Sequence, residues 1–267
     1  MMLLIIIGEL LNSTRKEIKE KISSRDVKYI QKIARKQEEN GADYIDVNAG
    51  DFAKNEKEHL LWMVKNVRAA VDCPLSLDSA NAEAIKTVLE KYPGEYIINS
   101  ISAETDKFND LLSPVLNYKT EVIALCMDDN GIPKQAEKKV TLAQKLTDKL
   151  LDKGVAPENI YLDPLVQPVS VQPDSAKEVI KAISLIDQWD LNINIVCGLS
   201  NISYGLPERK YLNQAFLIMC LEHGLNSVIA NPLDDYLLNL LKASDVILNK
   251  DSYGMNYIKA ARAGKLS

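Results

Sequence analysis

The amino-acid sequence predicts a single (β/α)8 barrel, in which eight parallel strands alternate with eight helices. The chain has 267 residues, and a barrel of this kind usually takes ~250 residues. Short β-branched or aliphatic runs alternate along the whole chain with longer segments of helical spacing, which favours a parallel sheet. These runs begin about every 32 residues, the length of one strand–helix unit. Because eight units fill residues 1–267, we expect one barrel domain.

The eight apolar runs are predicted to be the strands of the barrel. They cover residues 3–7, 44–47, 75–77, 96–98, 122–126, 160–162, 193–197 and 228–230. The first of them, within MMLLIII, ends after seven residues at Gly8. It has no positively charged region before it and no small-residue cleavage site after it. We therefore interpret it as a strand and not as a signal peptide.

Local signals predict where several helices begin and end. Residues 14–17 and 23–26 fit the capping-box pattern of a helix start. Pro207 stands where the seventh helix should begin, and Gly41 and Gly154 stand where two other helices should end. The tail after the eighth unit, from Ser252 onward, is predicted to be a closing helix and a frayed end.

Composition and charge exclude several classes of protein. Hydrophobic residues make up 46% and charged residues 26% of the chain, which are values of an ordinary globular protein. The net charge of −5 comes without a long basic cluster, so neither nucleic acid nor an anionic membrane is an expected partner. No apolar stretch reaches the ~18 residues of a membrane span. The four cysteines are far apart in sequence, which predicts free thiols in a cytoplasmic protein.

Polar side chains follow nearly every predicted strand, at the end where barrel enzymes carry their catalytic residues. In the second and third strands they alternate with apolar residues, so that each polar pair faces one side of its strand. The sequence thus predicts a rim rich in carboxylates and amides. Its members are Glu9, Asp46, Asn48, Ser76, Asp78, Asn99, Ser100, Asp128, Asp163, Ser200, Asn201 and Asn231.

The same rim lacks the groups that several reactions need. No predicted strand ends in a lysine, so an aldolase that forms a Schiff base is not expected. His59 and His223 both fall in helical segments, which argues against a zinc site or a histidine general acid. A magnesium site is still compatible with so many oxygen ligands.

Aspartate and asparagine suit a flat heterocyclic ligand. A carboxylate accepts two parallel hydrogen bonds from a ring N–H and its neighbouring amino group, and an amide donates and accepts at once. A pteridinone ring has that pattern. The alternative for any one of these residues is that it caps the helix that follows its strand.

The stretch CGLSNISYGLPERK, at residues 197–210, is the densest motif of the chain. Together with five further blocks it resembles the methyltetrahydrofolate:corrinoid protein methyltransferases of anaerobic bacteria. The resemblance runs from Gly8 to the C-terminus. The other blocks are DYIDVNAG (43–50), LSLDS (75–79), INSISAE (98–104), ALCMDD (124–129) and YLDPLVQP (161–168).

This resemblance implies a barrel that binds 5-methyltetrahydrofolate and exchanges its methyl group with the cobalt of a corrinoid (cobalamin). Position by position, it implies that Asp78, Asn99 and Asp163 bind the pterin. It also implies that Asn201 forms a hydrogen bond near N5 and, with Asp163, is catalytic. Neighbouring pocket positions by the same comparison are Gly198, Ser200, Gln167 and Arg209.

The resemblance further implies a transient corrinoid protein partner and a homodimer. The corrinoid-binding signature D-x-H-x-x-G is absent, so we expect the corrinoid on a separate protein. The chain departs from the family at GELLNSTRK (8–16), where GERINGTRK is common, and at NPLD (231–234), where DPLD is common. These departures favour systems that demethylate methoxylated aromatics, methylamines or betaines, with tetrahydrofolate as methyl acceptor, over those that use the corrinoid iron–sulfur protein. The residues do not set the direction of transfer.

Three other functions are weighed against this one. Dihydropteroate synthase also binds a pterin in a barrel, but it needs cations near a pyrophosphate, and no Lys or Arg ends a strand here. A magnesium-dependent lyase or aldolase could be built on Asp46, Asp78 and Asp163. A folate-binding module without chemistry would bind the ligand but transfer no methyl group.

Overall fold

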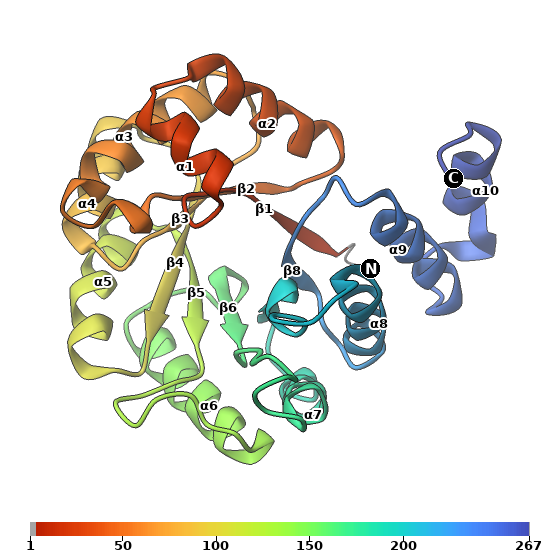
Figure 1. Ribbon diagram of the computed structural model, residues 1–267. Coiled ribbons are helices and arrows are strands. Elements are labelled where there is room, and N and C mark those ends of the chain that lie inside the picture. Colours follow the sequence, from red (N-terminus) through yellow and green to blue (C-terminus); the bar gives the residue numbers. More distant parts are fainter. Residues whose placement is uncertain (1–3, 267) are drawn as a thin grey trace.

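The computed structural model describes residues 4–266 and contains a closed barrel of eight parallel strands, as predicted. Each strand is hydrogen-bonded to the next along the chain, and β8 pairs with β1 to close the ring (Figure 1). The strands are β1 (Ile5–Asn12), β2 (Tyr44–Asn48), β3 (Leu75–Asp78), β4 (Tyr96–Ser102), β5 (Glu121–Leu125), β6 (Ile160–Asp163), β7 (Asn194–Gly198) and β8 (Ser227–Ala230).

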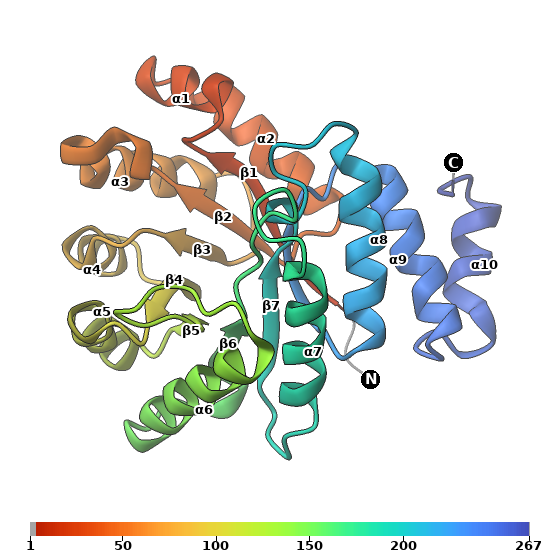
Figure 2. The ribbon, with the colours of Figure 1, turned by 60° about the horizontal axis from the view of Figure 1, so that its bottom comes forward.

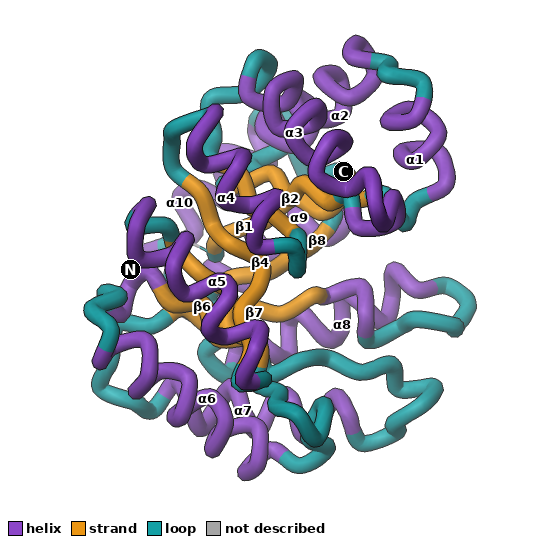
Figure 3. Tube along the Cα trace, turned by 90° about the vertical axis from the view of Figure 1, so that its left-hand side faces the viewer, coloured by secondary structure: helices purple, strands orange, loops and turns teal. Residues whose placement is uncertain are grey.

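Ten α-helices in the described part of the chain surround the strands, which Figure 3 shows in orange at the centre of the molecule. In that part no helix is long and apolar enough to cross a membrane. The helices are α1 (Lys16–Ser23), α2 (Val27–Glu39), α3 (Glu56–Arg68), α4 (Ala82–Lys91), α5 (Thr105–Tyr118), α6 (Ala136–Asp152), α7 (Ser175–Asp187), α8 (Arg209–Glu222), α9 (Asp235–Ile247) and α10 (Met255–Arg262).

Two strands continue at least four residues beyond the apolar runs that predicted them. The first run was predicted to end at Ile7, but β1 continues to Asn12; its predicted start, Leu3, lies outside the described residues. The fourth run was predicted to end at Ile98, but β4 continues to Ser102. Both strands continue past an irregularity in the register, because neighbouring parallel strands still supply backbone partners there. Polar side chains therefore stand within these two strands and not after them.

The predicted helix ends are right, but the predicted helix starts lie one to three residues too early. Gly41 and Gly154 adopt positive φ angles of 86° and 87° just after α2 and α6, as a helix-ending glycine does. Neither capping box forms: α1 has no side-chain cap, and Asp26 caps α2 by accepting from the Tyr29 backbone N–H at 3.1 Å. Pro207 precedes α8 by two residues and lies outside it.

The interior of the barrel is apolar in the part that precedes the polar rim along the strands, and it supports that rim. Its centre is a cluster of the buried side chains Ile7, Ile97, Ile123, Tyr161 and Val196. A larger apolar core fills the space between the strands and the helices. Since strand side chains alternate with a period of two, the residues two positions further along four of these strands face the same interior. They are Glu9, Asn99, Asp163 and Gly198.

The predicted closing helix is not the one that completes the barrel. Helix α9 follows β8 and packs beside α8, whereas α10 packs on α9 at the outside of the molecule (Figure 2). The tail thus adds a helix to a barrel that is already complete.

The cysteines are all free, and three are buried, but Cys73 is partly exposed.

Candidate functional site

The carboxyl ends of β2, β3 and β4 place three polar side chains in one row. In the strand register Asn48 is level with Asp78, and Asp78 is level with Asn99. The Asn48 amide accepts from the Ser13 hydroxyl at 2.8 Å and donates to the Asp78 carbonyl oxygen at 3.3 Å. The row offers a carboxylate between two amides, the pattern expected of a heterocycle site.

Asp46 lies two residues before Asn48 in β2, deeper in the barrel, and contacts this row. Its Oδ1 accepts from the Ser76 hydroxyl at 2.6 Å and from the Asn99 amide at 3.3 Å. The side chain is buried, and burial together with the neighbouring Asp78 carboxylate raises the pKa of Asp46 well above its usual value. Asp46 therefore orients Asn99 and can hold a proton inside the barrel. Sequence reasoning placed it on the rim but not in the pterin-binding set.

Asp78 is itself a perturbed acid. Burial raises its pKa to about 6, since the Asn48 amide that favours the carboxylate only partly offsets the loss of water. The carboxylate of Glu56 pushes the pKa in the same direction as burial. Two adjacent carboxyl groups with raised pKa values are a mark of a functional site.

Asp163 ends β6 on another side of the barrel and is also buried. Its Oδ1 accepts from the backbone N–H of Leu165 at 2.7 Å. Burial raises the pKa of Asp163 to about 6, opposed by that hydrogen bond and by the positive charge of Lys139. Gln167, four residues further on, is half-buried, and its backbone N–H donates to the Ser175 hydroxyl at 3.1 Å.

The loop after β7 carries Asn201 in a short 3₁₀ helix, η3 (Leu199–Asn201). The Asn201 side chain folds back onto the strand end: a methyl group added to Gly198 would come within 2.9 Å of the Asn201 amide nitrogen. Asn201 is otherwise exposed at the rim. Glycine at 198 thus makes room for the amide to lie where it does.

Replacing Gly198 with alanine tests this arrangement. Gly198 has an ordinary φ of −75°, so the new methyl group strains no backbone and its main effect is to displace the Asn201 amide. We expect a Tm within about 3 °C of wild type, because a cost below ~1 kcal/mol moves Tm little in a chain of this size. We expect the methyl transfer that the family resemblance implies to be at least about tenfold slower, since 1.4 kcal/mol of lost stabilisation suffices. An unchanged rate in stopped-flow measurements would contradict the proposed position of the Asn201 amide.

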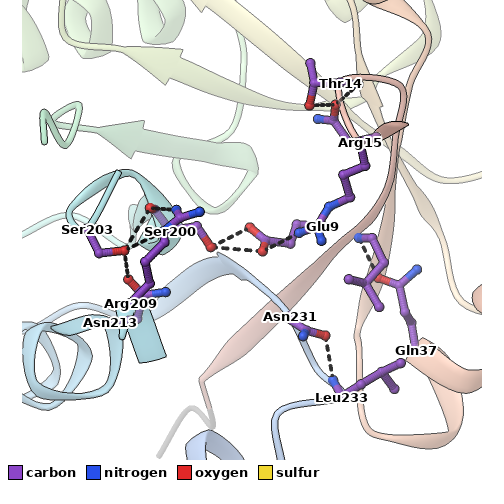
Figure 4. A network of polar contacts seen from close by, with 12 residues as sticks. Glu9, Thr14, Arg15, Gln37, Ser200, Ser203, Arg209, Asn213, Asn231 and Leu233 are labelled. Atoms are coloured by element: carbon purple, nitrogen blue, oxygen red, sulfur yellow. Dashed lines mark hydrogen bonds and ion pairs between the residues drawn. The ribbon is translucent and has the colours of Figure 1, made fainter. Parts of the chain in front are cut away.

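A network of polar contacts connects this loop to β1 (Figure 4). The carboxylate of Glu9 accepts from the Ser200 hydroxyl at 2.9 and 3.1 Å and from Arg15 at 2.9 Å. Burial raises the pKa of Glu9, while Arg15 and the Ser200 hydroxyl oppose that rise. The Glu9 carboxylate thus connects Ser200, the residue before Asn201, to β1, the strand that pairs with β8 to close the barrel.

Arg209 closes the same network from the start of α8. Its guanidinium donates to the Ser200 carbonyl oxygen at 2.5 Å and to the Ser203 hydroxyl at 3.0 Å. The Ser203 hydroxyl in turn donates to Asn213 at 2.7 Å. In this structure Arg209 therefore supports the loop that carries Asn201. No sequence signal distinguishes this contact from a direct contact with ligand.

Asp128, a predicted rim residue, and His59, which was predicted to lie in a helix, both lie apart from these groups. Asp128 stands three residues beyond the end of β5 and pairs with Gly131 in an isolated bridge. His59 lies in α3 and stacks on Phe52 with ring centroids 3.9 Å apart. Among the described residues, no cluster of three or more His, Cys, Asp or Glu side chains is arranged to hold a metal ion.

A family model described as pterin binding enzyme matches residues 8–231. The chain belongs to the pterin-binding enzymes. It is 37% identical to the methylcorrinoid:tetrahydrofolate methyltransferase of Eubacterium limosum, over 98% of each chain. Within the pterin-binding enzymes it therefore belongs to the methyltetrahydrofolate:corrinoid methyltransferases. It is 27% identical to the methionine synthase of Mycobacterium tuberculosis over 85% of this chain, which spans only 20% of that protein's length.

Solved structures confirm the fold of this pterin-binding enzyme. The dihydropteroate synthase of Yersinia pestis superposes with a TM-score of 0.70 at 13% identity, covering 92% of this chain and 93% of that one. The dihydropteroate synthase of Xanthomonas albilineans, in complex with 7,8-dihydropteroate, gives 0.67 at 14% identity, over the same shares of the two chains. At such identities the likeness extends to the barrel and no further.

Proposed function

We propose that this enzyme transfers a methyl group between the cobalt of a corrinoid and N5 of tetrahydrofolate. The observation that carries the proposal is the 37% identity over nearly the full length of both chains to a methylcorrinoid:tetrahydrofolate methyltransferase. The rim of carboxylates and amides supports it independently, because those groups fit a pteridinone. No feature of the site favours any of the three alternative functions. The likeness to dihydropteroate synthase is limited to the fold, and nothing in the site favours a magnesium lyase or an inert module.

In the proposed complex, Asp78, Asn99 and Asp163 hold the pterin ring. The two ionised carboxylates accept from ring N–H and amino groups, and the Asn99 amide both donates and accepts. Asn48 and Asp46 orient these groups through the contacts described above. Gly198, Ser200, Gln167 and Arg209 complete the surroundings, with Ser200 and Arg209 acting through the loop that carries Asn201.

Asn201 has the central role in the proposed chemistry. When the methyl group leaves N5, the folate nitrogen gains negative charge, and in the reverse direction it loses it. An amide N–H directed at N5 stabilises that charge in the transition state more than in the ground state, which is what accelerates the reaction. Asp46, whose pKa is raised well above its usual value, is placed to keep a proton in the surrounding network.

The corrinoid supplies the cobalt that takes or gives the methyl group, and we propose that a separate corrinoid protein carries it in a transient complex. By analogy with the methylcorrinoid:tetrahydrofolate methyltransferase of Eubacterium limosum, methyl transfer toward tetrahydrofolate is the proposed direction. We also propose that residues 1–267 act as one pterin-binding domain, that the enzyme is a homodimer, and that it is cytoplasmic. The four free cysteines support the last point.

The deciding experiment is an anaerobic absorbance measurement. Methylcobalamin and tetrahydrofolate are mixed with the protein, and the Co(I) band is followed; the reverse reaction starts from cob(I)alamin and 5-methyltetrahydrofolate. We expect conversion in at least one direction, abolished in Asp163→Ala. If folate binds but no methyl group moves, either to free cobalamin or to purified corrinoid proteins, the inert module replaces the enzyme. If the protein binds no folate, the magnesium-dependent lyase replaces both.

A further inference from the structure

Lys139 is a buried lysine outside the site described so far. It lies in α6, behind β6, and only 1% of its surface is exposed. Its ammonium group donates to the carbonyl oxygens of Pro164 and Leu165, at 2.6 and 3.0 Å. Lysine is rarely buried to this degree unless it is paired. The two carbonyls that it binds follow directly after Asp163.

Those contacts reach the Asp163 carboxyl group through one residue. Leu165 accepts from Lys139 with its carbonyl oxygen and donates to Asp163 Oδ1 with its N–H at 2.7 Å. The Leu165 backbone is in the left-handed region, with φ of 59°, a conformation that costs a branched residue free energy unless neighbouring contacts hold it. Lys139 supplies such contacts, so the turn that orients Asp163 depends on a side chain from another element.

The charge of Lys139 matters as well as its hydrogen bonds. Burial lowers the pKa of Lys139, and the nearby carboxylates of Asp163 and Glu178 oppose that change. Toward Asp163, Lys139 is the one positive neighbour among the described groups that shift its pKa. The other titratable side chains near Asp163 are the buried thiols of Cys126 and Cys197.

We propose that Lys139 is a positioning residue that holds the 163–165 turn and keeps Asp163 ionised to receive the pterin. This inference rests on the proposed function, in which the Asp163 carboxylate accepts hydrogen bonds from the pterin ring. It assigns a role to a helix residue that never touches the ligand. A neutral donor could satisfy the two carbonyls, but only a cation also favours the carboxylate.

The two contributions of Lys139 have different dependences on pH. With an Asp163 pKa of about 6, the carboxylate that binds pterin is lost as pH falls through 6. Removing the nearby cation raises this midpoint by ~1 unit or more. The loss of affinity relative to wild type is then about tenfold at pH 5 and vanishes by pH 8.5. A purely structural loss lowers affinity by one factor at every pH.

The test compares Lys139→Met with Lys138→Met. Both variants remove one positive charge from α6, but Lys138 is exposed. The affinity for 5-methyltetrahydrofolate is measured by calorimetry between pH 5 and 8.5. We expect a pH-dependent loss in Lys139→Met and none in Lys138→Met. A loss that is equal at all pH values, or no loss, overturns the proposal.

A second measurement separates this inference from the proposed function. The ¹³C resonance of the Asp163 carboxyl group, assigned with Asp163→Asn, is titrated in the ligand-free protein. We expect its midpoint to rise in Lys139→Gln, which keeps a hydrogen-bond donor and removes the charge. An unchanged midpoint overturns the role of Lys139 even if folate binds normally. If wild type binds no folate while the midpoint still rises, the proposed function fails and the coupling of Lys139 to Asp163 stands.

Discussion

Replacing Asn201 with alanine is expected to slow methyl transfer about a hundredfold and to leave folate affinity nearly unchanged. One well-placed donor to a developing negative charge is worth ~3 kcal/mol in the transition state. The same amide contributes little to ground-state binding, because N5 carries no such charge before the methyl group leaves. The rate is measured in single turnovers with cob(I)alamin, and the affinity separately by calorimetry.

Asn117→Ala provides the matched control. Asn117 is an exposed asparagine in α5, where its amide donates to the Ser113 hydroxyl at 3.1 Å, so the same chemical change occurs far from the strand ends. Both rate and affinity should equal those of wild type. If Asn201→Ala instead weakens folate binding a hundredfold and transfers the bound methyl group at the normal rate, Asn201 serves binding and not the chemical step.

The sequence predicts the barrel and the composition of its rim because both follow from local periodicity. Alternation within a strand decides which side chains face the interior, and parallel strands bring their carboxyl ends together. Asp46, Asp78 and Asn99 could therefore be placed on one rim before any contact was known. The hydrogen bond from Asn99 to Asp46 could not be predicted, because it depends on the strand register, which the length of each loop leaves open.

Lys139 shows where such reasoning ends. Its position in α6 has nothing in its neighbourhood to distinguish it from the many surface lysines of amphipathic helices. Only the packing of α6 against the barrel places its ammonium group against the Asp163 turn. The same holds for Arg209, which a motif comparison associates with ligand but which the fold directs to the loop carbonyl of Ser200.

Replacing Asp78 with asparagine is expected to weaken pterin binding and, at neutral pH, to stabilise the fold. An asparagine cannot accept two parallel hydrogen bonds from the pterin, so we expect a loss of ~3 kcal/mol, or about a hundredfold in affinity. The stability effect comes from burial, which raises the pKa of Asp78 from 3.8 to about 6. The unfolded chain therefore ionises this group more readily than the folded protein does.

This difference in ionisation between the folded and unfolded states affects stability only above the ordinary pKa of aspartate. Below pH 3.8 the carboxyl group is protonated in both states, and wild type and Asp78→Asn should be equally stable. Between pH 3.8 and 6 the ionised aspartate increasingly destabilises the fold of wild type, and above pH 6 the difference stays constant at ~3 kcal/mol. Asp190→Asn, an exposed aspartate in the loop after α7, controls for the loss of charge.

Chemical denaturation at pH 4 and pH 7.5 decides between two accounts of Asp78. We expect Asp78→Asn to gain far more stability at pH 7.5 than at pH 4, since the destabilising species is the buried carboxylate. A gain of equal size at pH 4 would trace the effect to packing and not to ionisation. A gain at pH 7.5 joined to a hundredfold loss of pterin affinity identifies a carboxylate that the fold retains at the expense of stability, because the ligand requires its charge.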